Sequence, residues 1–131
     1  MRKQFKHIAL IDDDQVFNFI TTKIITKSTD FQVTTYTNAQ PAIQQFDTWS
    51  ISEPDKLPDI IFLDINMPVM DGWEFLEALQ KTASTTEKIY KVFIFFSSIS
   101  SYDIEKSKQH RMVHDFVSKP LTTDKLNTMA G

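Results

Sequence analysis

The sequence predicts an α/β domain in which helices cover both faces of a parallel sheet. Three short segments, residues 8–11, 60–63 and 92–96, are apolar at every position, as strands buried on both faces are. Segments with helical spacing of apolar residues lie between them, so that strand and helix alternate five times along the chain. This alternation is typical of a parallel sheet with right-handed crossovers.

The two remaining strands are expected from weaker signals, at residues 31–36 and 115–117. The longest loops are predicted at residues 50–58 and 81–90, which are polar segments. The apolar stripes of four predicted helices are Val16, Phe17, Ile20 and Ile24; Ala39, Ala42, Ile43, Phe46 and Trp49; Phe75, Leu76 and Leu79; and Leu121, Leu126 and Met129.

Two of the predicted helices carry a further signal. Asn38 stands where a side chain can cap the second helix. The segment 100–109 has only Tyr102 and Ile104 as apolar anchors, so we expect a loosely held helix there.

Composition limits the possible classes of protein. A length of 131 residues suits a single domain, and the last 11 residues after Pro120 leave room for one helix and no output domain, so residues 1–131 are expected to be one unit. The net charge of -3, with scattered basic residues, argues against nucleic-acid binding. The absence of cysteine excludes disulfides and thiolate metal sites. Without a signal peptide or a long apolar segment, we expect a cytoplasmic protein with no membrane contact.

Acidic residues follow two of the predicted strands, Asp12, Asp13 and Asp14 after the first and Asp64 at the end of the third. Ligands of open α/β sheets bind at the carboxyl ends of the strands. Carboxylates brought close together repel one another and need a counter-charge, which a divalent hard cation such as Mg²⁺ supplies. The alternative is that Asp13 or Asp14 only caps the next helix; we expect Asp14 to cap and Asp12 and Asp13 to serve the metal.

Two further polar residues stand at strand ends, Ser97 and Lys119. The Lys119 ammonium suits a phosphate or carboxylate, although a lysine taken alone is more often a surface residue. Pro120 can fix the turn that aims Lys119, with a cis bond as one way of doing so. Ser97 can donate to a phosphoryl oxygen or simply begin a loop, and Phe116 is by default a core residue. Three carboxylates, Mg²⁺ and one lysine sum to nearly zero charge, which favours electrostatic positioning of phosphoryl transfer.

Four motifs in the expected order resemble the receiver domain of two-component response regulators, at residues 11–14, 63–72, 96–98 and 117–120. The resemblance covers nearly the whole chain and is to stand-alone receivers, such as the chemotaxis response regulator and sporulation phosphorelay intermediates. It implies a flavodoxin-like (βα)5 fold with three layers and strand order 2-1-3-4-5.

The resemblance also implies roles for individual residues. Asp64 would be the phosphoacceptor, Asp13 a direct Mg²⁺ ligand, and Asp12 an acid acting largely through metal-bound water. Asn66 would add its backbone carbonyl to the metal. Lys119 would pair with the phosphoryl oxygens.

Three residues would control the switch and its lifetime. Ser97 would be the hydroxyl that moves to meet the phosphoryl group, and Phe116 the aromatic that swings inward with it. Because Ile99 stands near the expected approach of an attacking water, its apolar side chain is predicted to slow hydrolysis of the phosphoryl group.

The implied function is to accept a phosphoryl group from a sensor histidine kinase or a histidine phosphotransfer protein and to signal to a downstream target that the sequence does not identify. The protein would be a signalling domain rather than an enzyme, and a monomer or a weak phosphorylation-dependent dimer. The predicted partner-binding residues are Tyr102, Ile104, Lys106 and His114.

Three alternatives are weaker. A Mg²⁺-dependent phosphatase with an aspartate nucleophile typically has a second aspartate two residues later, where this chain has Asn66. A flavin-binding module needs a phosphate-cradling loop after the first strand, where this chain has three acids. A scaffold that is never phosphorylated would not need the full set of acids, serine and lysine.

Overall fold

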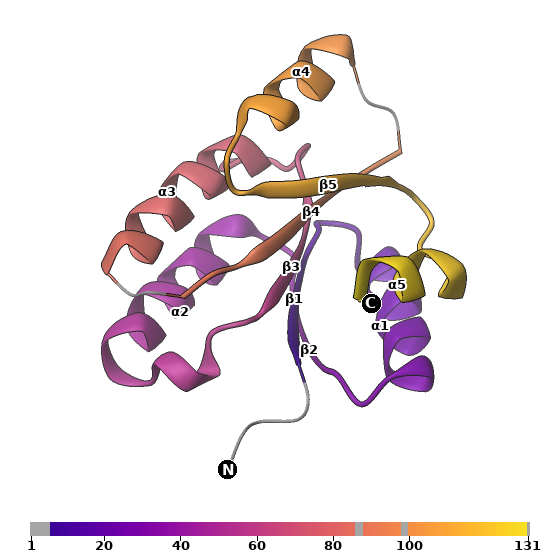
Figure 1. The fold of residues 1–131 in the computed structure, drawn as a ribbon, viewed down its shortest axis with the longest axis horizontal. Coiled ribbons are helices and arrows are strands. Elements are labelled where there is room, and N and C mark those ends of the chain that lie inside the picture. The colour runs from indigo at the N-terminus through magenta and orange to yellow at the C-terminus, as the bar shows by residue number, and fades with distance from the viewer. Residues whose placement is uncertain (1–5, 86–87, 98–99, 131) are drawn as a thin grey trace.

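A computed structural model, which describes residues 6–85, 88–97 and 100–130, contains a five-stranded parallel sheet (Figure 1). The strand order is β2-β1-β3-β4-β5, as the family resemblance implied. The strands are β1 (His7–Ile11), β2 (Gln32–Tyr36), β3 (Ile60–Asp64), β4 (Lys91–Phe96) and β5 (Val113–Ser118).

Helices cover both faces of the sheet, so the predicted three-layer arrangement is confirmed. In Figure 1, α2 and α3 lie on one face, α1 and α5 lie on the other, and α4 lies beyond α3 toward the β5 edge. The helices are α1 (Gln15–Ser28), α2 (Ala39–Ser52), α3 (Gly72–Thr85), α4 (Ser101–Gln109) and α5 (Thr123–Ala130), with a short 3₁₀ turn, η1 (Pro54–Lys56), after α2.

The inner strands are apolar except at their ends, because alternate side chains enter two separate cores. In β3, Ile61 and Leu63 join the core under α2 and α3, whereas Ile60 and Phe62 join the core under α1 and α5. The second core is rich in aromatic contacts, with the Phe62 and Phe95 ring centroids 4.9 Å apart. Covering both faces in this way holds the ends of β1 and β3 at fixed positions in the middle of the sheet.

The helix predicted after the first acids is present, but part of its predicted buried stripe is wrong. Val16 is 67% exposed and Ile20 is 51% exposed, whereas α1 buries Asn18, Thr21 and Ile25. The physical reason lies partly in Asn18, whose amide nitrogen donates to the backbone carbonyl of Asp12 at 2.8 Å. That bond turns a polar face of the helix inward, which the spacing of apolar residues could not reveal.

Helix starts were predicted better than helix ends. Asp14 caps α1 by accepting from the Phe17 N–H at 3.0 Å, and Asn38 caps α2, both as expected. The predicted loops begin too early, because α2 continues to Ser52 and α3 continues to Thr85. In α3, the buried Thr82 hydroxyl donates to the Asp47 carboxylate on α2, which ties the two helices together near their ends.

The weaker strands are both present with shifted limits. β2 begins at Gln32 rather than residue 31, and β5 spans Val113–Ser118 rather than residues 115–117. Both are edge strands, whose exposed side chains explain why their apolar signals were weak.

Among the residues that the structure describes, no helix is both long and apolar enough to span a bilayer.

Candidate functional site

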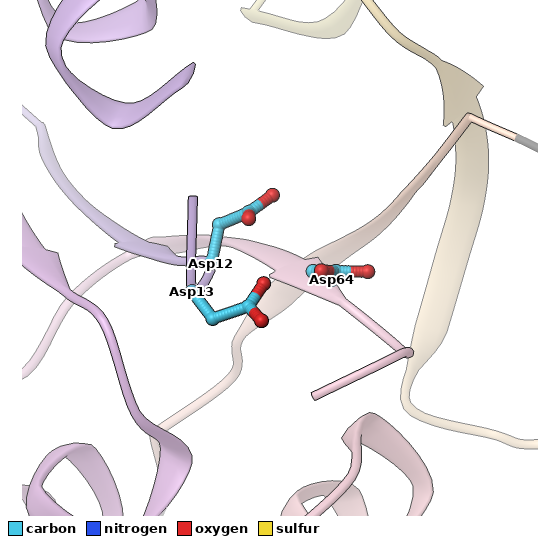
Figure 2. A group of neighbouring side chains, drawn as sticks. All are labelled: Asp12, Asp13 and Asp64. Atoms are coloured by element: carbon cyan, nitrogen blue, oxygen red, sulfur yellow. The ribbon is translucent and has the colours of Figure 1, made fainter. Parts of the chain in front are cut away.

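The structure brings the acids that end β1 and β3 to one place at the carboxyl edge of the sheet. The two strands are neighbours and pair Ile11 with Leu63, so the residues that follow them, Asp12 and Asp64, come side by side. Figure 2 shows Asp12, Asp13 and Asp64 grouped there, and one carboxylate oxygen from each lies within 4.8 Å of the others. This convergence was predicted from the two strand ends.

Backbone donors hold two of the three carboxylates in place. Asp12 is 1% exposed, and its Oδ1 accepts from the Asp14 N–H at 2.9 Å. Asp64 Oδ1 accepts from the Asn66 N–H at 3.0 Å. Asp13, by contrast, is exposed to solvent. The cluster therefore has two fixed, buried carboxylates and one that reaches it from the surface.

Lys119 supplies a positive charge to the same cluster. Its Nζ lies 2.7 Å from Asp12 Oδ2 and 4.0 Å from Asp64 Oδ2, and it also lies 4.4 Å from the centroid of the Phe17 ring. The backbone N–H of Lys119 donates to the backbone carbonyl of Phe96 at 2.8 Å, and the Lys119–Pro120 peptide bond is cis. The sequence indicated Lys119 but assigned Phe17 only to a helix stripe, so the aromatic wall beside the ammonium was missed.

The electrostatics of the cluster show a shortage of positive charge. Burial raises the pKa of Asp64 to about 6, and the negative charges of Asp12 and Asp13 contribute, against the opposing effects of the Asn66 N–H and Lys119. Burial also raises the pKa of Asp12, despite the neighbouring Lys119 ammonium. Three carboxylates facing one lysine can hold a divalent cation, and their oxygen atoms are the ligands that Mg²⁺ prefers.

The register of β3, β4 and β5 relates Ser97 and Phe116 to the strand end that carries Asp64. Their roles in the switch stay predictions. Asp64 pairs with Phe95 across β3 and β4, so Ser97 stands two residues beyond that pair, and it is exposed. Phe116, on β5, is half-buried with its ring centroid 5.8 Å from that of Phe96. The predicted effect of Ile99 on hydrolysis concerns a residue that lies outside the described part of the chain.

The loop after Asp64 is closed tightly at its base. The Gly72 N–H donates to the Ile65 carbonyl at 3.1 Å, and a Cβ atom at Gly72 would lie 2.6 Å from Ile65 Cα. No side chain fits at that separation, so glycine is required for this closure. Asp71 and Glu74 then start α3 with a reciprocal capping box, each side chain accepting from the other's backbone N–H. Asn66 begins this loop, and the metal contact of its carbonyl stays a prediction.

The predicted partner-binding residues lie on α4 and β5. Tyr102 is 69% exposed and His114 is also exposed, whereas Ile104 and Lys106 are half-buried. Tyr102 is therefore not the apolar anchor of α4 that the sequence suggested.

Comparison with known proteins places these features in context. The family model of the response regulator receiver domain matches residues 8–130. A two-component response regulator from Cytophaga hutchinsonii has a similar crystal structure, with 31% sequence identity and a TM-score of 0.85, over 98% of this chain and 96% of that chain. The chemotaxis protein CheY of Listeria monocytogenes is 29% identical over 118 residues, which cover 89% of each protein. The chemotaxis protein CheY4 of Vibrio cholerae shares the fold at 17% identity, with a TM-score of 0.73 over 97% of both chains.

Proposed function

Because the chain belongs to the receiver domain family of two-component response regulators, which act in phosphorelay signalling, we propose that Asp64 is the residue that accepts the phosphoryl group. The observation that carries this assignment is the grouping of three carboxylate oxygens within 4.8 Å, with Lys119 beside them, at the carboxyl edge of the sheet. Asp64 is buried and ends the central strand. The Lys119 ammonium lies 4.0 Å from its Oδ2, farther than the 2.7 Å that separates the same ammonium from Asp12.

The proposed reaction transfers a phosphoryl group from a phosphohistidine of the donor to Asp64. An ionised oxygen of Asp64 attacks the phosphorus, the O–P bond forms as the P–N bond breaks, and the histidine nitrogen keeps the electron pair. Since the pKa of Asp64 is about 6, this oxygen is ionised at pH 7. A carboxylate has no proton to lose, so no general base is needed.

The residues around Asp64 can neutralise the charge of the product. Lys119 can move from Asp12 toward the phosphoryl oxygens over a short distance, and Ser97 would donate its hydroxyl to them. Asp12, Asp13, Asp64 and the Asn66 carbonyl would hold Mg²⁺, whose positive charge offsets that of the phosphoryl oxygens.

Intact mass measurement with acetyl phosphate and Mg²⁺ tests the acceptor. We expect the parent protein to gain the mass of one phosphoryl group, Asp64→Asn to gain none, and removal of Mg²⁺ by a chelator to suppress the gain. Asp71→Asn, a change to an acid of the same loop whose capping role asparagine can keep, should behave as the parent. No gain on the parent, or equal gain on Asp64→Asn, would overturn the assignment and favour a scaffold role.

The donor would be a sensor histidine kinase or a histidine phosphotransfer protein, and α1 offers it a contact surface. Val16, Phe19 and Ile20 are 67%, 62% and 51% exposed, and α1 begins one residue after Asp14, beside the acidic cluster. A protein that brings its phosphohistidine to Asp64 would cover these side chains.

Replacement of one of these residues separates docking from chemistry. We expect Ile20→Ser to slow transfer from a phosphorylated histidine phosphotransfer domain by about tenfold while leaving the gain from acetyl phosphate unchanged. Ile51→Ser is the matched control, because Ile51 is 87% exposed on α2, which covers the opposite face of the sheet. Equal slowing by both variants, or by neither, would contradict the docking assignment.

A further inference from the structure

Trp73, the second residue of α3, joins that helix to α4 by three contacts. Its indole N–H donates to Asp103 Oδ1 at 3.3 Å, and the Lys106 ammonium lies 5.1 Å from the centroid of its ring. The imidazole of His110, just after α4, lies at an interplanar angle of 33° with its centroid 6.3 Å away. Trp73 itself is 9% exposed, so these contacts are made by a largely buried ring.

The contacts with Trp73 stand out because α4 is otherwise weakly held. Every residue of α4 whose burial the structure describes is half-buried or exposed, whereas α2 buries four residues completely or nearly so. Tyr102, the largest apolar side chain of α4, is 69% exposed. A helix with so little buried surface is easily displaced, and its position depends on the few contacts it has.

Trp73 is also connected to Asp64 through a short, rigid piece of backbone. Its neighbour Gly72 donates to the Ile65 carbonyl at 3.1 Å, and Gly72 lies so close to the backbone that a Cβ would be 3.1 Å from the Asp64 carbonyl oxygen. Displacement of the backbone at Asp64 or Ile65 is therefore passed to Gly72 and to the indole beside it.

We propose that Trp73 is a latch that holds α4 in its resting position and couples that position to the state of Asp64. The latch consists of the contacts from Trp73 to Asp103, Lys106 and His110. Phosphorylation of Asp64, on which this inference rests, shifts the closed base of the loop and weakens the latch, so that α4 is released. The route runs through the backbone from Ile65 to Gly72 and into α3, rather than through the side chains of Ser97 and Phe116.

A small shift of the Trp73 indole is enough to weaken the latch, because of the kind of contacts it makes. A cation over an indole ring and a hydrogen bond of 3.3 Å both weaken quickly with distance and angle. His110 contributes as a neutral ring, since its Nδ1 accepts from the Met112 N–H at 3.3 Å and burial lowers its pKa. The contacts from Trp73 to Asp103 and Lys106 are therefore sensitive to a small movement of the indole.

Hydrogen–deuterium exchange of α4 amides tests the latch in the resting protein. With no phosphodonor present, we expect Trp73→Leu to accelerate exchange within residues 101–109 by about fivefold, from loss of the cation–π contact and the hydrogen bond. Lys106→Met, which keeps the side-chain stem and removes only the charge, should accelerate it by a smaller factor. Trp49→Leu is the matched control, because Trp49, on α2, packs against Phe46 of the same helix and His7 of β1, and its replacement should leave α4 unchanged.

The same measurement after phosphorylation tests the coupling. In the parent, acetyl phosphate and Mg²⁺ should accelerate exchange of α4, and in Trp73→Leu the further acceleration should be largely lost while the mass gain at Asp64 is kept. Full acceleration in Trp73→Leu, or unchanged resting exchange in both Trp73→Leu and Lys106→Met, overturns the inference. If Trp73→Leu does not fold by circular dichroism, Lys106→Met decides. Absence of the mass gain in the parent is a different result, which overturns the acceptor assignment itself.

Discussion

Replacing Lys119 by methionine should destabilise the metal-free protein at pH 7 by about 3 kcal/mol, as expected when one partner is removed from a buried ion pair. Lys119 Nζ lies 2.7 Å from Asp12 Oδ2, and Asp12 is 1% exposed, so the variant leaves a buried carboxylate without its cation. Methionine keeps an apolar stem against the Phe17 ring, which limits the effect to the lost charge. Urea denaturation in a chelating buffer measures the change.

Two conditions should reduce this loss for the same electrostatic reason. Saturating Mg²⁺ brings a replacement charge to Asp12 and Asp64, and lowering the pH allows these carboxyl groups, whose pKa values are already raised, to take up protons. Lys27→Met, a change to an exposed lysine at the end of α1, should cost less than about 0.5 kcal/mol under all conditions. A loss in Lys119→Met that does not depend on Mg²⁺ or pH would mean that packing, and not charge, is responsible.

Replacing Asp64 by asparagine should have the opposite effect and stabilise the metal-free protein at pH 7 by about 3 kcal/mol. The folded protein raises the pKa of Asp64 from 3.8 to about 6, and each unit corresponds to about 1.4 kcal/mol of free energy. Asparagine keeps an oxygen that can accept from the Asn66 N–H and removes the repulsion with Asp12 and Asp13.

The pH dependence of this gain follows from the direction of the shift. Because the folded state binds the Asp64 proton more tightly than the unfolded state, the parent loses stability as the pH rises from about 3.8 through about 6. The advantage of Asp64→Asn should therefore be full at pH 7 and should disappear near pH 4. Thermal denaturation of the parent, Asp64→Asn and the exposed-residue control Asp30→Asn between pH 4 and 7 measures it. A gain that is equal at both pH values would show that the ionisation of Asp64 does not cause it.

The convergence of the acids could be predicted because it depends on strand ends, and strand ends are marked directly in the sequence. An apolar run that stops at Asp12 and another that stops at Asp64 fix two carboxylates at one edge as soon as the strands are neighbours. Lys119 could be placed by the same argument, since it directly follows β5. The order of the strands, however, came from the resemblance to a family and not from the apolar pattern.

What the sequence could not reveal were side chains whose partners come from distant segments. The buried face of α1 depends on the bond from Asn18 to the Asp12 carbonyl, which overrides the spacing of Val16 and Ile20. From the sequence, Phe17 and Trp73 cannot be told apart from ordinary aromatic core residues. Only the folded chain places charged groups over their rings. Tertiary contacts between polar and aromatic groups leave no periodic signal in the chain.

The closed base of the loop after Asp64 has a consequence for how this protein could diverge. The hydrogen bond from the Gly72 N–H to the Ile65 carbonyl joins the two ends of the loop, so residues 66–71 lie between fixed ends. Asn66 contacts Asp64 through its N–H, Met67 is buried in the core, and Asp71 caps α3, so these three are fixed by their contacts. The exposed Pro68 and Val69 can be exchanged without removing any of these contacts. Only this exposed part of the loop can vary to recognise new partners while the acidic cluster stays intact.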